Sequence, residues 1–255
     1  MVNGGKLNMN ATGEPVEIHV LDKKVRLLQP AGGFRTSLDS VMLAAACPAQ
    51  GGARVLDMGC GVGGASFCLL HRVPDCHLTG IDIQSLCIEL ANKNKSLNNN
   101  TERCGFICGD VCGYNVENPA ARFDHVICNP PYLEAGAHTQ SPHEGKAVAL
   151  GHEDASLNEW LDAGFRNLKS GGTFTIIQRA DMTDKIILGL GRRFGAVEII
   201  PLWPRQGAAA KRVIIRAIKD RKTPATLHPG LVLHEADGGY TAETEKILRG
   251  GERLF

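Results

Sequence analysis

Short apolar runs recur along the chain, and each is bounded by Gly, Asp or Pro. The five clearest runs are 53–59, 77–83, 104–110, 123–129 and 173–178. Runs of this length and composition predict β-strands. Between them, apolar residues recur at helical spacing along 84–98 and 156–168, and Ser156 with Glu159 forms a capping box before the second helix. Strands and helices are therefore expected to alternate through the middle of the chain.

This alternation defines the expected fold class. Short apolar strands separated by helices predict a parallel sheet that is covered on both faces. Two later strands, 196–201 and 211–218, are joined by a connection of Pro, Gly and Ala without a helical pattern, so we expect an antiparallel pair at a sheet edge. The prediction is an α/β, Rossmann-like fold with a seven-stranded, mostly parallel sheet and an antiparallel last strand.

The chain is expected to form one large domain preceded by a short cap. Residues 36–46 have the pattern of a capped helix, which places an N-terminal cap segment and helix within 1–50. Residues 51–255 would then form the catalytic domain, which ends in a basic hairpin and a tail. No linker rich in Gly and Ser divides it. Residues 133–155 form a long polar segment, and loops of this length usually serve as functional lids or are mobile segments.

A glycine-rich turn, VLDMGCGVGG (55–64), follows the first strand of the series and precedes a helix. Its glycines let the backbone approach a ligand closely, and an acid at the end of the next strand lies at the spacing that suits ribose hydroxyls. The candidate cofactor residues here are Asp57, Gly59, Gly61, Gly63, Asp82 and Ile83. A nicotinamide or flavin site fits the same pattern, so an oxidoreductase stays open at this point.

A third strand end adds Gly109 and Asp110, whose carboxylate can accept a hydrogen bond from an adenine amino group. Acids after three successive strands resemble the S-adenosylmethionine-dependent, class I methyltransferases. The resemblance implies that the glycine turn lies under the methionine part of the cofactor. It also implies that the second acid holds the ribose and that the third acid reads the adenine.

The fourth strand ends in a rigid corner, Asn129-Pro130-Pro131-Tyr132. Adenine's exocyclic amine is a poor nucleophile because its lone pair is delocalised into the ring. The Asn129 side-chain oxygen and the Pro130 carbonyl can accept its two N–H groups and draw the nitrogen toward tetrahedral geometry. Both prolines fix φ, so these acceptors are pre-organised, and Tyr132 offers a ring on which a base can stack. The four residues are the candidate catalytic set, and Asn129, expected next to the cofactor's methyl group, is also a candidate cofactor residue.

The corner resembles that of amino-methyltransferases acting on adenine, guanine or glutamine-amide nitrogens. Two flanks, 29–46 and 227–248, resemble bacterial tRNA adenine-N6 methyltransferases, which modify the adenosine next to the anticodon of a valine tRNA. The segment His228-Pro229-Gly230 departs from that family's pattern. The resemblance implies that residues of the first flank close over the cofactor: Phe34, Arg35, Thr36 and Asp39. For Asp39, a plain place in the first turn of the helix is an equal alternative.

The charge distribution adds a candidate RNA surface. The chain has a net charge of +1, but residues 201–222 hold seven Lys and Arg against one Asp, a charge of +6 that leaves the rest at −5. Such a stretch suits RNA phosphates or, alternatively, a solvated strand edge. The residues expected to flank the open side of the site are Arg205, Lys211, Arg212 and Arg216. We therefore expect a tRNA partner.

Composition narrows the remaining classes. No apolar run reaches the ~20 residues of a membrane helix, and the first residues lack an apolar signal core, so we expect a cytoplasmic protein without a membrane partner. Nine cysteines lie within expected strands and helices, which indicates reduced thiols, and we expect no metal site. The oligomeric state stays open. The alternatives are an rRNA guanine-N2 or protein-glutamine methyltransferase and, outside this class, a nicotinamide-dependent oxidoreductase.

Overall fold

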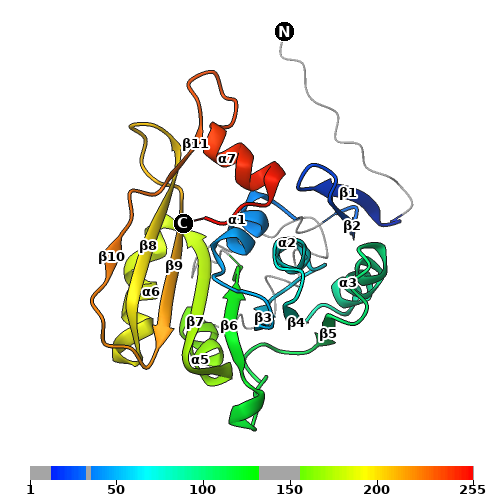
Figure 1. Cartoon of the computed structure of the whole chain (residues 1–255), viewed down its shortest axis with the longest axis horizontal. Coiled ribbons are helices and arrows are strands. Elements are labelled where there is room, and N and C mark those ends of the chain that lie inside the picture. Colours follow the sequence, from blue (N-terminus) through cyan, green and yellow to red (C-terminus); the bar gives the residue numbers. More distant parts are fainter. Residues whose placement is uncertain (1–12, 33–35, 132–155, 255) are drawn as a thin grey trace.

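A nine-stranded sheet forms the centre of the protein (Figure 1). The computed structural model describes residues 13–32, 36–131 and 156–254. The sheet is built from β3 (Arg54–Met58), β4 (His77–Asp82), β5 (Cys104–Cys108), β6 (Phe123–Cys128), β7 (Leu168–Arg179), β8 (Phe194–Arg205), β9 (Arg212–Lys219), β10 (Thr226–Leu227) and β11 (Leu231–His234). Its order is β10-β8-β9-β7-β6-β3-β4-β5, and β11 also pairs with β8.

The direction of the strands agrees with the predicted fold class. The strands β3 to β7 pair in parallel, whereas β9 is antiparallel to both β7 and β8. Among the described strands of this sheet, β9 alone runs in the opposite direction, as predicted for the last strand of seven. The sheet is wider than predicted because the short strands β10 and β11 add to β8 in parallel. The β8–β9 pair therefore does not form the free edge that the sequence suggested.

Helices cover both faces of the sheet. Their bounds are α1 (Leu38–Ala46), α2 (Gly64–Arg72), α3 (Ser85–Leu97), α5 (Leu157–Asn167), α6 (Thr183–Leu190) and α7 (Ala242–Glu245). Short 3₁₀ turns lie at Pro119–Ala121, Ala180–Met182 and Gly191–Arg193, and Lys246–Gly250 forms a π-helical turn. The predicted capping box opens α5: Ser156 Oγ accepts from the Glu159 amide, and the Glu159 carboxylate accepts from the Ser156 amide.

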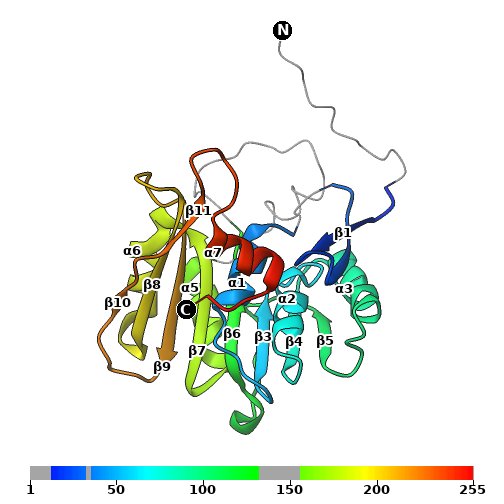
Figure 2. The ribbon, with the colours of Figure 1, turned by 45° about the horizontal axis from the view of Figure 1, so that its top comes forward.

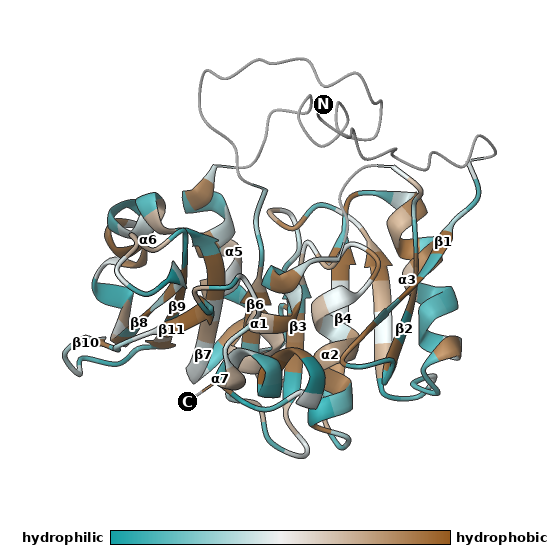
Figure 3. Cartoon of the chain, turned by 90° about the horizontal axis from the view of Figure 1, so that it is seen from above, coloured by the Kyte–Doolittle hydropathy of each residue, from teal (hydrophilic) through white to brown (hydrophobic). Residues whose placement is uncertain are grey.

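Two apolar clusters, one on each face, hold the sheet and helices together. One cluster joins α1 and α2 to residues of β3, β6 and β7, and the other joins α5 and α6 to alternate residues of the same strands. Figure 3 shows hydrophobic residues along the strands in the middle of the molecule and hydrophilic residues on the outside of α3. This alternation is what a sheet buried on both faces requires.

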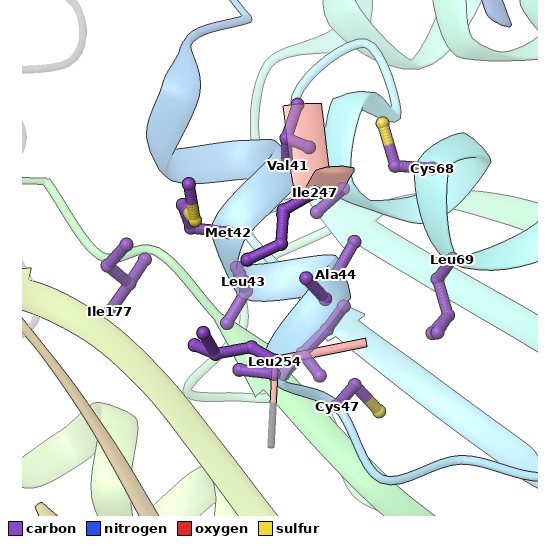
Figure 4. Packing of buried hydrophobic residues seen from close by; sticks show 14 of the residues in the cluster. Val41, Met42, Leu43, Ala44, Cys47, Cys68, Leu69, Ile177, Ile247 and Leu254 are labelled. Carbon is purple, nitrogen blue, oxygen red and sulfur yellow. The ribbon is translucent and has the colours of Figure 1, made fainter. Parts of the chain in front are cut away.

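The C-terminal segment packs on α1. Val41, Leu43 and Ala44 of α1 lie close to Ile247 and Leu254 of the tail in Figure 4, and all five side chains are buried. The Leu254 amide also donates to the carbonyl oxygen of Ala45, 2.9 Å away. Figure 2 shows α7 and the following segment lying over α1. The tail is thus part of the same apolar core as the N-terminal helix.

The N-terminal hairpin is tied to the sheet through α3. Strands β1 (Val16–Val20) and β2 (Val25–Gln29) form an antiparallel pair outside the main sheet. The buried Asn94 side chain of α3 accepts from the Leu28 amide at 2.7 Å and donates to the carbonyls of Leu28 and Val62, both at 3.0 Å. Because Val62 belongs to the turn between β3 and α2, one side chain connects the hairpin to that turn.

Candidate active site at the carboxyl edge of the sheet

The glycine turn between β3 and α2 is open to a ligand at one position. Gly59, Gly61 and Gly63 all have left-handed backbone angles, with φ of +68°, +53° and +88°. A Cβ on Gly59 would lie 2.6 Å from Trp160, and a Cβ on Gly63 would lie 2.6 Å from Phe67. At Gly61, no described atom lies within 4 Å of the Cβ position. Side chains therefore pack against the turn at Gly59 and Gly63, whereas its backbone is open at Gly61.

Asp57 lies beneath this turn. Its side chain is 2% exposed, and its carboxylate accepts a hydrogen bond from Ser66 Oγ of α2 at 2.6 Å. Burial raises the pKa of Asp57 to about 7, and the nearby charge of Asp82 adds to the rise. Asp57 thus supports the glycine turn and the start of α2 from inside the protein.

Asp82 holds the exposed side of the same turn. One carboxylate oxygen accepts from the Gly61 amide at 2.8 Å, and the other accepts from the Gln84 amide at 2.9 Å. Burial raises the pKa of Asp82, and these two backbone amides oppose the rise. Each carboxylate oxygen has a further lone pair, so Asp82 can bind ribose hydroxyls without releasing the turn.

The third acid lies further along this edge. Asp110 is exposed and accepts from the Cys112 amide at 2.9 Å, and the Gly109 amide donates to the Asp82 carbonyl at 2.9 Å. Beside Asp82, the apolar side chain of Ile83 is 57% exposed. An exposed large apolar side chain next to two acids suits the face of a purine ring. Two other exposed apolar residues, which the sequence analysis did not single out, occur at the ends of neighbouring elements: Leu86 and Ile107.

The register of β3 and β6 brings the Asn-Pro-Pro corner beside the glycine turn. Met58 pairs with Cys128, so the next residue on each strand, Gly59 and Asn129, leaves the sheet at the same edge. Asn129 is half-buried and Pro130 is buried. The Pro130 carbonyl accepts a hydrogen bond from the Gln178 side chain of β7 at 3.4 Å. Pro131 is half-buried, whereas Tyr132 lies outside the described residues.

The N-terminal segment contacts the start of α2. A Cβ on Gly64 would lie 2.8 Å from both Oγ1 and Cγ2 of Thr36, so the Thr36 side chain lies directly over this helix end. The Thr36 amide donates to the Gln29 side chain at 3.2 Å. Asp39 forms an ion pair with Arg212 of β9, 3.0 Å from oxygen to nitrogen, which ties α1 to the basic strand. Phe34 and Arg35 lie outside the described residues.

The basic stretch 201–222 is divided between the two edges of the sheet, which corrects the prediction of one patch. Eight residues of extended strand span about 26 Å, so the ends of β9 cannot share a surface. Arg205 and Lys211 are exposed at the carboxyl edge, where Arg212 pairs with Arg179 at the end of β7. Arg216, predicted to face the site, is 7% exposed, pairs with Glu198 and donates to the Ala46 carbonyl. The remaining basic residues lie toward the opposite edge: Lys219, Arg221 and Lys222.

The order of the seven central strands, with the antiparallel β9 between β7 and β8, is that of the Rossmann-like methyltransferases. A family model described as Methyltransferase small domain matches residues 35–202, about two thirds of the chain. The chain belongs to this family. Family membership confirms the predicted methyltransferase activity and S-adenosylmethionine as the methyl donor, and it excludes the alternative of a nicotinamide-dependent oxidoreductase.

Individual relatives extend this similarity over most of the chain. A tRNA1(Val) (adenine(37)-N6)-methyltransferase of Vibrio campbellii is 25% identical over 85% of this chain and 88% of its own length. An enzyme of the same name from Aeromonas hydrophila is 28% identical over 82% of this chain and 86% of its own length. These similarities confirm the family resemblance read from the corner and its flanks.

A solved structure shares the fold. The crystal structure of a predicted O-methyltransferase from Agrobacterium tumefaciens superposes with a TM-score of 0.68 at 24% sequence identity. The match covers 85% of this chain and 98% of that one. Within the described residues, no helix is long and apolar enough to cross a membrane. Over the same residues, no cluster of three or more His, Cys, Asp and Glu side chains could hold a metal ion.

The residues at this edge fit S-adenosylmethionine. Gly61 leaves room where a side chain would stand, Asp82 retains lone pairs for ribose hydroxyls, and Ile83 exposes an apolar surface directly after Asp82. The sequence analysis missed two supports of this site. Trp160 of α5 packs against Gly59, and Asn94 of α3 holds Val62. Trp160 had the signal of a core residue of a helix, and nothing local marked its contact with the turn.

The open position at Gly61 predicts selective loss of cofactor binding. Gly61→Ala meets no described atom within 4 Å, so it should cost only the ~1–2 kcal/mol of a left-handed alanine in stability. Its methyl group would nevertheless occupy the ligand's space, and we expect the Kd for S-adenosylmethionine, measured by calorimetry, to rise more than tenfold. Gly207→Ala is the matched control, since Gly207 has φ of +77° and equally open surroundings. Equal affinities of the two variants would contradict this placement of the cofactor.

The buried carboxyl group of Asp57 predicts a pH-dependent stability difference. Its pKa is about 7 in the folded protein, above the unfolded value near 4, so the folded state retains a proton that the unfolded state has lost between these values. Asp57 therefore lowers the free energy of unfolding as pH rises from about 4 to 7. Asp57→Asn should remove this effect. The free energy of unfolding of the variant, relative to that of wild type, should therefore increase by on the order of 2–4 kcal/mol as pH rises from 4.5 to 8.

Denaturant unfolding at several pH values measures this difference. The same substitution at the exposed Asp110 controls for the loss of one carboxylate. A constant difference between wild type and Asp57→Asn from pH 4.5 to pH 8 would show that Asp57 is ionised in the folded protein throughout.

Proposed function

We propose that this protein transfers a methyl group from S-adenosylmethionine to the 6-amino group of an adenine in tRNA, at the position next to the anticodon. The observation that supports the proposal is the pairing of Met58 with Cys128, since it brings Asn129 out of the sheet beside the glycine turn. A methyl acceptor held by the corner therefore faces a cofactor held by the turn. The names of the relatives supply the substrate class.

The corner supplies two hydrogen-bond acceptors on a backbone whose φ angles are fixed at both prolines. The Asn129 side-chain oxygen and the Pro130 carbonyl would each accept one N–H of the amino group, which draws its lone pair out of conjugation with the ring. The bound cofactor supplies an electrophilic methyl group on a sulfonium. The acceptor nitrogen held by these two oxygens would become cationic on methylation and would pass its proton to water, so no strong general base is required. Tyr132 would stack on the base from the segment that follows.

The hairpin between β8 and β9 is the proposed contact for tRNA phosphates. Its tip carries the exposed Arg205 and Lys211, and the Lys211 carbonyl accepts from the amide of Ala180, directly after β7. The hairpin thus rises at the same edge as the corner, two residues beyond Gln178. The proposal places cations beside the site where a folded RNA loop would dock. A tRNA substrate also agrees with the expected cytoplasmic location.

The same corner would serve an rRNA guanine-N2 or a protein-glutamine methyltransferase. Transfer of tritiated methyl from S-adenosylmethionine to unmodified tRNA, to rRNA and to protein separates the three classes. Digestion of the labelled tRNA and mass spectrometry would identify N6-methyladenosine next to the anticodon. Label only in rRNA or only in protein would overturn the tRNA proposal and leave the methyltransferase class intact.

Asn129→Ala should abolish transfer while cofactor binding is kept. The substitution removes one of two acceptors for the amino group, a loss expected to lower kcat about 10²–10³-fold. The glycine turn and Asp82 are untouched, so the Kd for S-adenosylmethionine should change less than twofold. Single-turnover methylation of the acceptor and calorimetry of the cofactor measure the two quantities. Wild-type kcat in the variant would show that the corner has only a structural role.

The divided basic stretch predicts that only one of its ends binds RNA. Arg205→Glu and Lys211→Glu, at the carboxyl edge, should each raise the Kd for tRNA about tenfold and lower its salt dependence by about one counterion. Arg221→Glu and Lys222→Glu make the same charge changes at the opposite edge and should leave the Kd within twofold. Filter binding at several salt concentrations tests this. Equal losses at both edges would mean that tRNA responds to net charge alone.

A further inference from the structure

Gln178 is a buried polar residue near the carboxyl end of β7. It follows Ile176 and Ile177 on β7, and its side chain is 3% exposed. A buried amide without partners costs free energy, but both ends of this one are paired. Its oxygen accepts from the amide of Arg179 at 2.9 Å, and its nitrogen donates to the Pro130 carbonyl at 3.4 Å. The side chain therefore has one defined orientation, toward the Asn-Pro-Pro corner.

The backbone cannot make the connection that Gln178 makes. The ladder between β6 and β7 ends at the pair of Cys128 with Ile176. Beyond it, Pro130 and Pro131 have no N–H, and Gln178 itself pairs with Val213 of β9 on the other side of β7. In the described parts of the chain, the Gln178 side chain provides the hydrogen bond from β7 to the corner. The Gln178 side chain thus connects β7 to the corner beyond the last backbone pair of β6 and β7.

This hydrogen bond acts on a backbone angle of the corner that the Pro130 ring does not fix. The ring of Pro130 fixes φ, but the direction of its carbonyl depends on ψ. A following proline restricts ψ to a range of about 40°. Within that range the carbonyl oxygen can still swing, and a donor fixed on β7 selects one direction. A carbonyl oxygen has two lone pairs, so one remains for a substrate N–H.

We propose that Gln178 is a positioning residue for methyl transfer: it aims the Pro130 carbonyl so that its second lone pair meets the amino nitrogen of the acceptor. The proposal rests on the proposed function of the corner and adds a residue to it. Gln178 does not touch the acceptor; it acts through Pro130. Its effect on activity is therefore expected in the rate of the chemical step, with the affinities for cofactor and acceptor largely unchanged.

Gln178→Met tests the loss of the donor. Methionine has nearly the same length and volume, so the apolar surroundings stay filled, but it cannot donate to the Pro130 carbonyl. We expect the single-turnover rate constant of methyl transfer, at saturating cofactor and acceptor, to fall about 10- to 100-fold. The Kd for S-adenosylmethionine and the KM for the acceptor should stay within twofold. Gln50→Met, at an exposed position before β3, is the matched control and should match wild type.

Gln178→Glu distinguishes a positioning role from a packing role, because only a positioning role makes the kcat of the variant depend on pH. When protonated, the carboxyl group introduced there donates an O–H to the Pro130 carbonyl and replaces the amide. When ionised, it repels the same oxygen. Burial raises the pKa of such a carboxyl group, so its titration falls within the accessible range. The kcat of this variant, divided by that of wild type at each pH, should decrease as pH rises from about 5.5 to 8.5.

The outcomes separate this inference from the proposed function. If wild type methylates its acceptor and Gln178→Met retains full kcat, the inference is wrong and the function stands. A loss shared by Gln178→Met and Gln178→Glu without pH dependence, or accompanied by lost cofactor binding, would mean a structural role and would also overturn it. If wild type methylates no amino nitrogen in RNA or protein, the proposed function fails and the inference falls with it.

Discussion

The site depends on the absence of two backbone donors. Pro130 and Pro131 bring no N–H, so β6 cannot extend its pairing beyond the carboxyl edge, where β3 also ends. The carboxyl edge between β3 and β7 therefore stays open. The glycine turn lies on one side of the gap and Gln178 on the other. A strand that continued through this point would close the gap and leave no place for an acceptor.

The parts of the fold and site that carry local signals were predictable from the sequence. The capping box formed by Ser156 and Glu159 marks the start of α5. The turn after β3 needs glycines because its backbone adopts left-handed angles. Acids at the ends of successive parallel strands must reach one edge, whatever the details of packing. The Asn-Pro-Pro corner is equally local, because proline stiffness needs no tertiary contact.

The remaining features depend on register and burial, which the sequence does not reveal locally. Arg216 reads as one more cation of a basic stretch, yet its place in the middle of β9 buries it against Glu198. Asp57 reads as a ligand-facing acid but lies under the turn, paired with Ser66. Gln178 reads as a polar strand end, and only the pairing of β6 with β7 brings it to Pro130. In each case a neighbour distant in sequence decides the role.

The Asn94 side chain has a consequence for how the protein responds to its cofactor. It donates to the carbonyls of Leu28 and Val62, so one side chain connects the β1–β2 hairpin to the glycine turn. Thermodynamic linkage is reciprocal. If a bound cofactor stabilises the turn and the hairpin joined to it, then an ordered hairpin increases the affinity for the cofactor by the same free energy. Substitutions that weaken this hairpin would therefore lower the affinity for the cofactor.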